Sequence, residues 1–169
     1  MLEADDLPTI RMVEAMDLGP PFEILFAPAA GPRTKPKALN AALVFARGAF
    51  TVVFDAEDRP DPGQLREALA TFEDDWAGEL ACVQARLAID NPSSGWLAAL
   101  FAAEYAGQFD VLLPGLAAFR LPLPLGGSSN HFRTAALRAA GGWDAYNVTE
   151  DADLGTRLAR LGYRAGMIG

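Results

Sequence analysis

One short stretch constrains the fold of this chain more than any other: an apolar, strand-like run that ends in carboxylates. Residues 50–54 read Phe-Thr-Val-Val-Phe, and Asp55, Glu57 and Asp58 follow at once. Such a run is typical of a strand that is covered on both faces, as in the central sheet of an α/β protein. Ligands of α/β proteins bind beyond the carboxyl ends of the strands. The sequence therefore predicts an α/β fold with an acidic site at the end of this strand.

Strand-like and helix-like segments alternate along the rest of the chain, which supports the same fold class. Further strands are expected at residues 22–26, 81–88 and 163–168. Helices are expected at residues 7–18, 36–47, 91–109, 134–140 and 150–161, and another begins at the helix signal 61–64. A loop or short helical pieces are expected at proline-rich residues 112–125. The length suits one domain over residues 1–169.

Two of the expected helices differ in how they would meet the core. The helix that follows residues 61–64 is expected to bury one apolar stripe, made of Leu65, Leu69, Phe72 and Trp76. The segment 96–109 is apolar nearly all round, so we expect it to leave an exposed apolar surface. Its few polar residues, including Glu104 and Gln108, lie one turn apart and could line a groove for a substrate.

A second carboxylate cluster, Thr149-Glu150-Asp151, opens the last expected helix. Both carboxylate clusters have two explanations. They can hold a divalent cation and remove a proton, or they can serve structure alone. In the structural case the first cluster is a solvated turn, and the second caps its helix at ~0.3–1 kcal/mol per acidic residue. Asp153 and Arg157 have the spacing of a surface ion pair.

Composition excludes several classes of protein. The net charge is −8, so the positive footprint of a nucleic-acid partner is missing. Cys82 is the only cysteine, which favours a reducing compartment without a disulfide framework. The acidic start of the chain does not look like a signal peptide, and no stretch is long and apolar enough to span a bilayer.

Two further residues carry possible chemistry. Lys35 lies in a proline-flanked basic loop before a helix, where it can meet a phosphate group or remain a solvated cation. His131 is the only histidine, and it follows a segment of small residues, 126–130. A lone histidine is more often structural than catalytic, so His131 by itself indicates no reaction.

Three segments in combination resemble a known family. The series consists of Lys35-Pro36-Lys37-Ala38-Leu39-Asn40, then residues 54–58, then Gly141-Gly142-Trp143-Asp144 running into 149–151. In order and spacing it is similar to the family 2 glycosyltransferases, in particular to their membrane-associated, cellulose-synthase-like branch. The resemblance covers nearly the whole chain. It implies a GT-A fold, which is a nucleotide-sugar-binding α/β domain with a mainly parallel central sheet flanked by helices.

The resemblance also implies a reaction and a set of site residues. The reaction is the metal-dependent, inverting transfer of a hexose from a nucleotide-diphospho-sugar, such as a UDP-sugar, to an acceptor hydroxyl. Asp55 and Glu57 match the DxD motif, which holds Mg²⁺ or Mn²⁺ and the diphosphate, and Glu57 replaces the usual second aspartate. Asp151 matches the general base of the TED motif, and Lys35 matches a lysine near the diphosphate. His131, Glu150 and Trp143 are expected on the acceptor side.

Two motifs of the family have no counterpart in the chain. They are the N-terminal strand whose aspartate reads uracil, expected upstream of Leu7, and the later QxxRW motif with its transmembrane helices. We therefore expect a partial catalytic domain, soluble by itself, of a protein at the cytoplasmic face of a membrane that makes a polysaccharide or glycoconjugate from a saccharide or lipid-linked acceptor. Two alternatives stay open: a catalytically incomplete interaction domain, and a metal-dependent nucleotidyltransferase.

Overall fold

A computed structural model describes residues 1–169 of the chain, which forms two compact units. Unit 1 comprises Met1–Arg47 and Gly142–Glu150, and unit 2 comprises Gly48–Gly141 and Asp151–Gly169. The expectation of a single catalytic domain over residues 1–169 stays a prediction.

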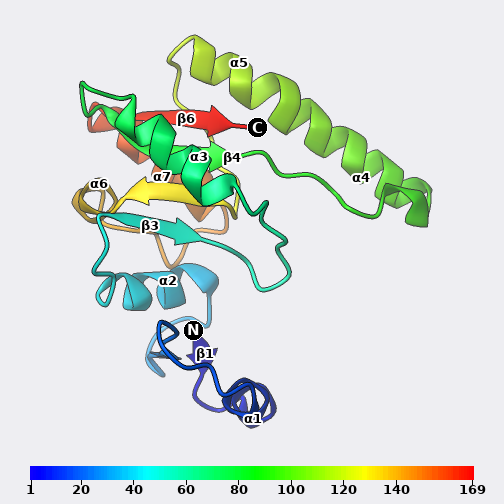
Figure 1. The fold of residues 1–169 in the computed structure, drawn as a ribbon, viewed down its shortest axis with the longest axis vertical. Coiled ribbons are helices and arrows are strands. Elements are labelled where there is room, and N and C mark those ends of the chain that lie inside the picture. Colours follow the sequence, from blue (N-terminus) through cyan, green and yellow to red (C-terminus); the bar gives the residue numbers. More distant parts are fainter. The chain divides into compact units, whose positions relative to one another are not determined.

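Unit 2 is built on a four-stranded sheet with the order β3-β5-β4-β6 (Figure 1). Its strands are β3 (Phe50–Val53), β4 (Leu80–Ala85), β5 (Asn130–Arg133) and β6 (Arg164–Ile168). The pair β4 and β6 is parallel, whereas β5 runs antiparallel to both β3 and β4. The α/β class is confirmed. The sheet is mixed instead of mainly parallel, because β5 inserts between β3 and β4 in the opposite direction.

Strand β3 lies at the edge of the sheet, which corrects one expectation. An apolar run was expected to be covered on both faces, but only Val53 of this strand is buried and Phe50 is 37% exposed. The central strand β4 is buried at every position, and this burial follows from having a hydrogen-bonded neighbour on each side. Hydropathy alone could not distinguish these two places in the sheet.

Helix α3 (Gln64–Glu73) packs on β4 and β6 and closes one core cluster. The members of this cluster are Ala68, Phe72, Leu80, Val83, Ala85 and Ile168. The predicted stripe was wrong except for Phe72, since Leu65 is 56% exposed and Trp76 is 95% exposed. The buried positions instead recur every four residues, at Gln64, Ala68 and Phe72, and the small Ala68 lets the helix approach the sheet.

Two further helices of this unit were predicted to within a residue or two. They are α6 (Thr134–Ala139) and α7 (Glu150–Arg160). Helix α7 lies very close to an extended segment, because a Cβ atom added to Gly155 would be 2.0 Å from the carbonyl oxygen of Leu123. Only glycine permits this approach. The predicted ion pair is present, with Arg157 Nε 2.6 Å from Asp153 Oδ2.

A long helical rod follows β4 and extends past the sheet (Figure 1). It consists of a 3₁₀ turn η1 (Pro92–Ser94), α4 (Trp96–Ala106), a wider π-helical turn η2 (Gly107–Leu112) and α5 (Leu113–Ala118). The expectation of a loop or short helical pieces over residues 112–125 is met by the short helix α5, and Pro114 stands in its first turn, where its missing N–H is tolerated. The expected exposed apolar surface is present, since α4 buries no residue. No helix combines the length and apolar composition that a membrane crossing requires.

Unit 1 contains two short helices and one short parallel strand pair. These are α1 (Leu7–Ala15), α2 (Lys35–Leu43), and β1 (Leu2–Glu3) with β2 (Phe26–Ala27). Helix α1 begins as predicted and ends three residues early, α2 begins one residue before and ends four residues before its predicted limits, and the strand expected at 22–26 is reduced to β2. Strand β1 was not predicted. Two residues are too few for a periodic pattern to reveal a strand.

Candidate functional site

A loop of carboxylates, residues 54–58, leaves the carboxyl end of β3 in unit 2. Hydrogen bonds fix this carboxylate loop. The N–H of Asp55 donates to Asp58 Oδ2 at 2.7 Å and to Ser128 Oγ at 3.2 Å, and the Ser128 hydroxyl also donates to Asp58. The Asp58 carboxylate is therefore committed to holding the turn. Asp55 is half-buried and Glu57 is exposed, which is where ligands of a cation in an open site would lie.

The hydrogen bonds that hold this loop continue into the core of unit 2. Gln84, fully buried on β4, donates to the carbonyl of Ser128 at 2.9 Å and accepts from the N–H of Gly126 at 2.8 Å. Asn130 donates to the carbonyl of Gly126 at 2.6 Å. These bonds satisfy buried amides, and they connect the centre of the sheet with the carboxylate loop. Buried polar networks that are fully satisfied make their surroundings rigid.

The donor set of the loop suits a hard cation only in part. No group of three or more His, Cys, Asp or Glu side chains gathers in an arrangement that could hold a metal ion. Asp55 and Glu57 provide oxygen ligands of the type that Mg²⁺ and Mn²⁺ take, and such ions commonly complete their shell with water and substrate phosphates. The residues present therefore fit a metal that arrives together with a phosphorylated ligand.

Asp151 lies in the first turn of α7 and is 8% exposed. This burial separates it from an ordinary helix-capping acid, which would be solvated. The charge of Asp151 acts on Cys82 in strand β4. Burial of the Cys82 thiol, together with this charge, raises the pKa of the thiol well above its ordinary value. A buried carboxylate at a helix start is a candidate for proton transfer.

In unit 1, Asn40 on α2 holds the segment that leads to α7. Asn40 Nδ2 donates to the carbonyl of Trp143 at 2.6 Å, and the N–H of Trp143 donates to Asn40 Oδ1 at 2.9 Å. Gly142, with a φ of +68°, makes room for this contact, since an added Cβ would be 2.3 Å from Asn40 Oδ1. Thr34 donates to the carbonyl of Ala145 at 3.0 Å. The N-cap of α2 and a residue within the helix thus both hold the segment Gly142–Glu150.

Turns formed by polar side chains shape the remainder of that segment. Asp144 Oδ1 accepts from the N–H of Tyr146 at 2.9 Å, and Asn147 Oδ1 accepts from the N–H of Thr149 at 3.0 Å. The hydroxyl of Thr149 also donates to Asn147 Oδ1. These local bonds are the usual way in which Asp and Asn form turns. They define the path of the chain into Glu150 and Asp151.

The predicted site residues fall into both units. Unit 1 contains Lys35, at the first position of α2, with Trp143 and Glu150. Unit 2 contains Asp55, Glu57, His131 and Asp151. Trp143 is buried at 3% exposure, whereas Lys35 and Glu150 are half-buried. The assigned roles of all these residues stay predictions.

His131 lies inside the sheet of unit 2, where its surroundings are structural. It is 4% exposed, its Nδ1 is 3.2 Å from the carbonyl oxygen of Val83, and its Nε2 is 3.5 Å from Gln64 Nε2. Burial lowers the pKa of this imidazole, and backbone hydrogen bonds oppose the shift. With Phe72 and other residues of α3 and β3, it lines an apolar cavity of about 220 Å³. Its predicted acceptor role has no support in this placement.

Comparisons with known proteins agree with the geometry. The sequence profile described as "Glycosyltransferase like family 2" matches residues 1–168. A beta-monoglucosyldiacylglycerol synthase of Trichormus variabilis is 30% identical over 129 residues, covering 73% of this chain and 26% of that protein. A probable glucomannan 4-beta-mannosyltransferase of Arabidopsis thaliana is 27% identical over 115 residues, covering 68% of this chain and 20% of that protein. The chain thus spans about a quarter or less of the length of these relatives.

The fold comparison gives the same result. A mannosyltransferase from Pyrobaculum calidifontis, solved in complex with GDP-Man and Mn²⁺, superposes with a TM-score of 0.67 at 21% identity. The match covers 97% of this chain and 42% of that one. At this identity the likeness establishes the GT-A fold, and the match of the family profile to residues 1–168 establishes the family. The chain belongs to the glycosyltransferases of family 2.

Proposed function

We propose that the protein transfers a sugar from a nucleotide-diphospho-sugar to an acceptor hydroxyl, with inversion at the sugar carbon. The observation that carries the proposal is the rigid carboxylate loop beyond β3, in which Asp58 and Ser128 hold the backbone of Asp55. The buried Asp151 supplies a second, separate carboxylate. The structural neighbour that holds GDP-Man and Mn²⁺ supports a donor and a metal of these classes.

In this proposal Asp55 and Glu57 hold Mg²⁺ or Mn²⁺ against the donor diphosphate. The bound cation would neutralise charge on the leaving group, an effect worth several kcal/mol. Lys35, at the start of α2, adds a positive charge for the same diphosphate, and the N-terminus of a helix favours phosphate as well. The resemblance of the motifs favours a UDP-sugar, whereas the structural neighbour holds GDP-Man, so both donors belong in any binding assay.

Asp151 is the proposed general base. It would take the proton of the acceptor hydroxyl while that oxygen forms the new bond to the sugar carbon and the diphosphate leaves from the opposite face. This single displacement inverts the anomeric centre. General-base assistance is worth ~10²–10⁴-fold in rate. Helix α7 presents Asp151 from a first turn that lies directly after the segment held by Asn40.

The acceptor is proposed to be a saccharide or a lipid-linked molecule. Glu150 directly precedes the proposed base and would contact the acceptor, whereas the buried Trp143 would act on the acceptor side by supporting the segment that leads to Glu150. The relatives are named for a glucosyldiacylglycerol and for glucomannan, so both acceptor classes occur among similar proteins. We further propose that the complete protein works at the cytoplasmic face of a membrane. The family match favours sugar transfer over nucleotidyl transfer.

The assignment of Asp151 is tested by Asp151→Asn in the full-length protein. Sugar transfer should fall by ~10²–10⁴-fold, with donor binding unchanged, because the base does not hold the donor. Asp153→Asn is the matched control on the same helix, since Asp153 pairs with Arg157 and should leave turnover near the wild-type rate. Transfer by Asp151→Asn at the wild-type rate would falsify the assignment.

The metal role of Asp55 needs a separate measurement. Calorimetric titration of UDP and GDP, with and without Mn²⁺, should show binding that depends on the cation, and Asp55→Asn should abolish that dependence. Asp61→Asn is a suitable control, because the Asp61 side chain accepts a local hydrogen bond from the N–H of Gly63, which asparagine can also accept. Equal affinity with and without Mn²⁺ would show that the loop is a structural turn.

A further inference from the structure

A groove lies in unit 2 at the end of the strands opposite to the carboxylate loop. The groove has a volume of about 450 Å³, within the range of ligand sites. Its lining includes Thr71, Trp76, Glu79, Arg120 and Arg164. Residues at the amino ends of β4 and β6 line it, whereas the carboxylate loop follows the carboxyl end of β3. A four-residue strand such as β3 spans about 13 Å, which separates the two places.

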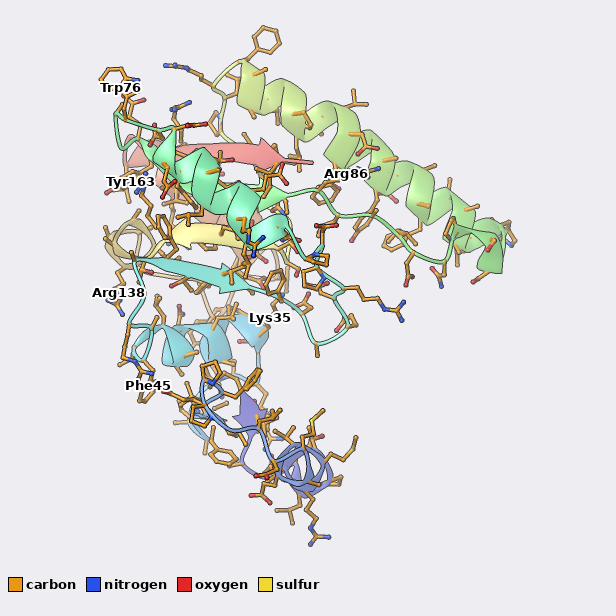
Figure 2. All side chains as sticks on the ribbon, viewed as in Figure 1. Lys35, Phe45, Trp76, Arg86, Arg138 and Tyr163 are labelled. Atoms are coloured by element: carbon orange, nitrogen blue, oxygen red, sulfur yellow. The ribbon has the colours of Figure 1, made fainter.

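Trp76 stands at the rim of this groove. It is 95% exposed in the loop that follows α3, and Figure 2 shows its side chain projecting outward. A tryptophan has a large flat face and a polar N–H, a combination suited to surfaces where one side of a ligand is apolar and the other is wet. The ring face of a pyranose sugar, with its C–H bonds on one side and hydroxyls around the edge, has this character.

Arg120 provides an independent indication. Its φ is +55°, and it occupies the position after the α5 C-cap where glycine is usual. The hydrogen bonds of that motif are present: Arg120 N to Ala117 O at 3.0 Å and Leu121 N to Leu116 O at 2.9 Å. An arginine is strained here, and such strain concentrates at functional positions. Its guanidinium forms no hydrogen bond or ion pair within the chain, so its five donors are available to a ligand.

Three further charged residues of the groove, Asp75, Glu79 and Arg164, form ion pairs through Arg164, and Asp74 adds another carboxylate. Arg164 Nη2 is 3.3 Å from Asp75 Oδ1, and Arg164 Nε is 3.2 Å from Glu79 Oε2. The Asp75 carboxylate is only 6% exposed and accepts from the N–H of Leu80 at 2.8 Å. With two arginines and three carboxylates in its lining, the groove offers both hydrogen-bond donors and acceptors and has only a small net negative charge. This favours a neutral ligand with many hydroxyl groups over an anionic one.

We propose that this groove binds a neutral oligosaccharide, with Trp76 stacked on one sugar ring and Arg120 donating to its hydroxyls. The site holds glycan without transferring sugar, and it lies apart from the carboxylate loop. The inference rests on the proposed function to the extent that a sugar-transferring enzyme meets an acceptor or product glycan. A growing or finished chain held here would stay near the enzyme between transfers.

Titration calorimetry of the purified protein with cellotetraose and mannotetraose tests the site. Saturable binding of at least one oligosaccharide is expected, and Trp76→Ala should weaken it by roughly tenfold or more. This variant leaves folding intact because the side chain is almost fully exposed. Trp96→Ala is the matched control, since Trp96 is 80% exposed but lies on α4. The affinity of this variant for the oligosaccharide should equal that of the wild type. Equal losses in both variants, or no binding at all, would overturn the proposal.

Arg120→Gly separates a binding role from a structural one. Glycine relieves the strained backbone, so the thermal midpoint should rise or stay constant while affinity for the oligosaccharide falls. Unchanged affinity would remove Arg120 from the site. Asp55→Asn, measured in the same titration, should bind oligosaccharide normally even though it loses metal-dependent nucleotide binding. If Asp55→Asn loses both oligosaccharide binding and nucleotide binding, the glycan binds at the transfer site and the proposal is wrong. If the wild type binds oligosaccharide but no nucleotide, the glycan site stands and the proposed function is refuted.

Discussion

Helices α4 and α7 have the same length, eleven residues, and nearly opposite composition and burial. Helix α4 reads Trp-Leu-Ala-Ala-Leu-Phe-Ala-Ala-Glu-Tyr-Ala and buries no residue. Helix α7 has five charged residues and buries four positions: Asp151, Leu154, Gly155 and Leu158. The pattern of a helix, and not its apolar content, decides how it joins a core. The apolar positions of α7 recur at intervals of three or four residues and form one face, whereas those of α4 point in every direction.

The sharpest test of this contrast compares two leucines. Leu154 on α7 is fully buried and Leu97 on α4 is 64% exposed. Leu154→Ala should lower the free energy of unfolding by about 3–5 kcal/mol, because it removes buried methyl groups and leaves a cavity. Leu97→Ala should change it by less than about 0.5 kcal/mol. Urea unfolding followed by circular dichroism measures both, and similar losses would contradict the assigned burial.

Glycines give a second, smaller contrast. Gly155→Ala should destabilise the protein by about 1–3 kcal/mol, because the new Cβ overlaps the carbonyl of Leu123. Gly107, at the end of α4, has a helical φ of −58° and no atom within 4 Å of an added Cβ. Gly107→Ala should therefore stabilise by about 0.5–1 kcal/mol. A loss of stability in Gly107→Ala would show that α4 packs more closely than the structure indicates.

The surface charges of α7 should matter least for stability. Arg157→Ala removes the pair with Asp153 and a hydrogen bond to the carbonyl of Ala140. The ion pair is partly exposed, so its own contribution is about 0.3–0.5 kcal/mol and should weaken in high salt. A double-mutant cycle with Asp153→Ala isolates this energy. A coupling energy above about 1 kcal/mol would place the pair in a buried environment.

Substitutions on α4 should change association more than stability. Trp96, Phe101 and Leu112 are exposed together with other apolar residues of the rod. Phe101→Ser should leave the unfolding free energy within about 0.5 kcal/mol of wild type and reduce self-association of the isolated chain in light scattering. Thr156→Ser on α7 is a mild control. A wild-type chain that stays monomeric at high concentration would show that the exposed surface is not adhesive.

Local features of the fold were readable in the sequence, and long-range pairings were not. The limits of α7 follow from its acidic first turn and its apolar repeat, so they were predicted within one residue. The position of β3 was equally clear, but its place at the sheet edge depends on the reversed β5, which no local pattern reveals. Trp76 was assigned to the core because it fitted a helical spacing, yet α3 ends at Glu73 and leaves it in a loop.

The candidate site shows the same division. The order of Lys35, Asp55 and Asp151 along the chain could be recognised from motifs, whereas their supports could not. Ser128 holds the turn that contains Asp55 from 73 residues away, and Asn40 holds Trp143 from 103 residues away. Two signals accompanied the contact of Ser128 with Asp55: a glutamine in the otherwise apolar strand β4, and a run of small residues before β5. Neither signal identifies the residue with which it forms a contact.

The pair of hydrogen bonds between Asn40 and Trp143 also affects the order in which the protein folds. Unit 1 is discontinuous, because its two segments are separated in sequence by Gly48–Gly141. Bringing distant segments together carries an entropic penalty that grows with the length of the open loop. Strands β3, β4 and β5 lie within the intervening residues, and their pairing shortens that loop before Asn40 contacts Trp143. During synthesis α2 therefore has no partner segment until residues 142–150 have been made, and unit 2 still needs β6 after that point to complete its sheet.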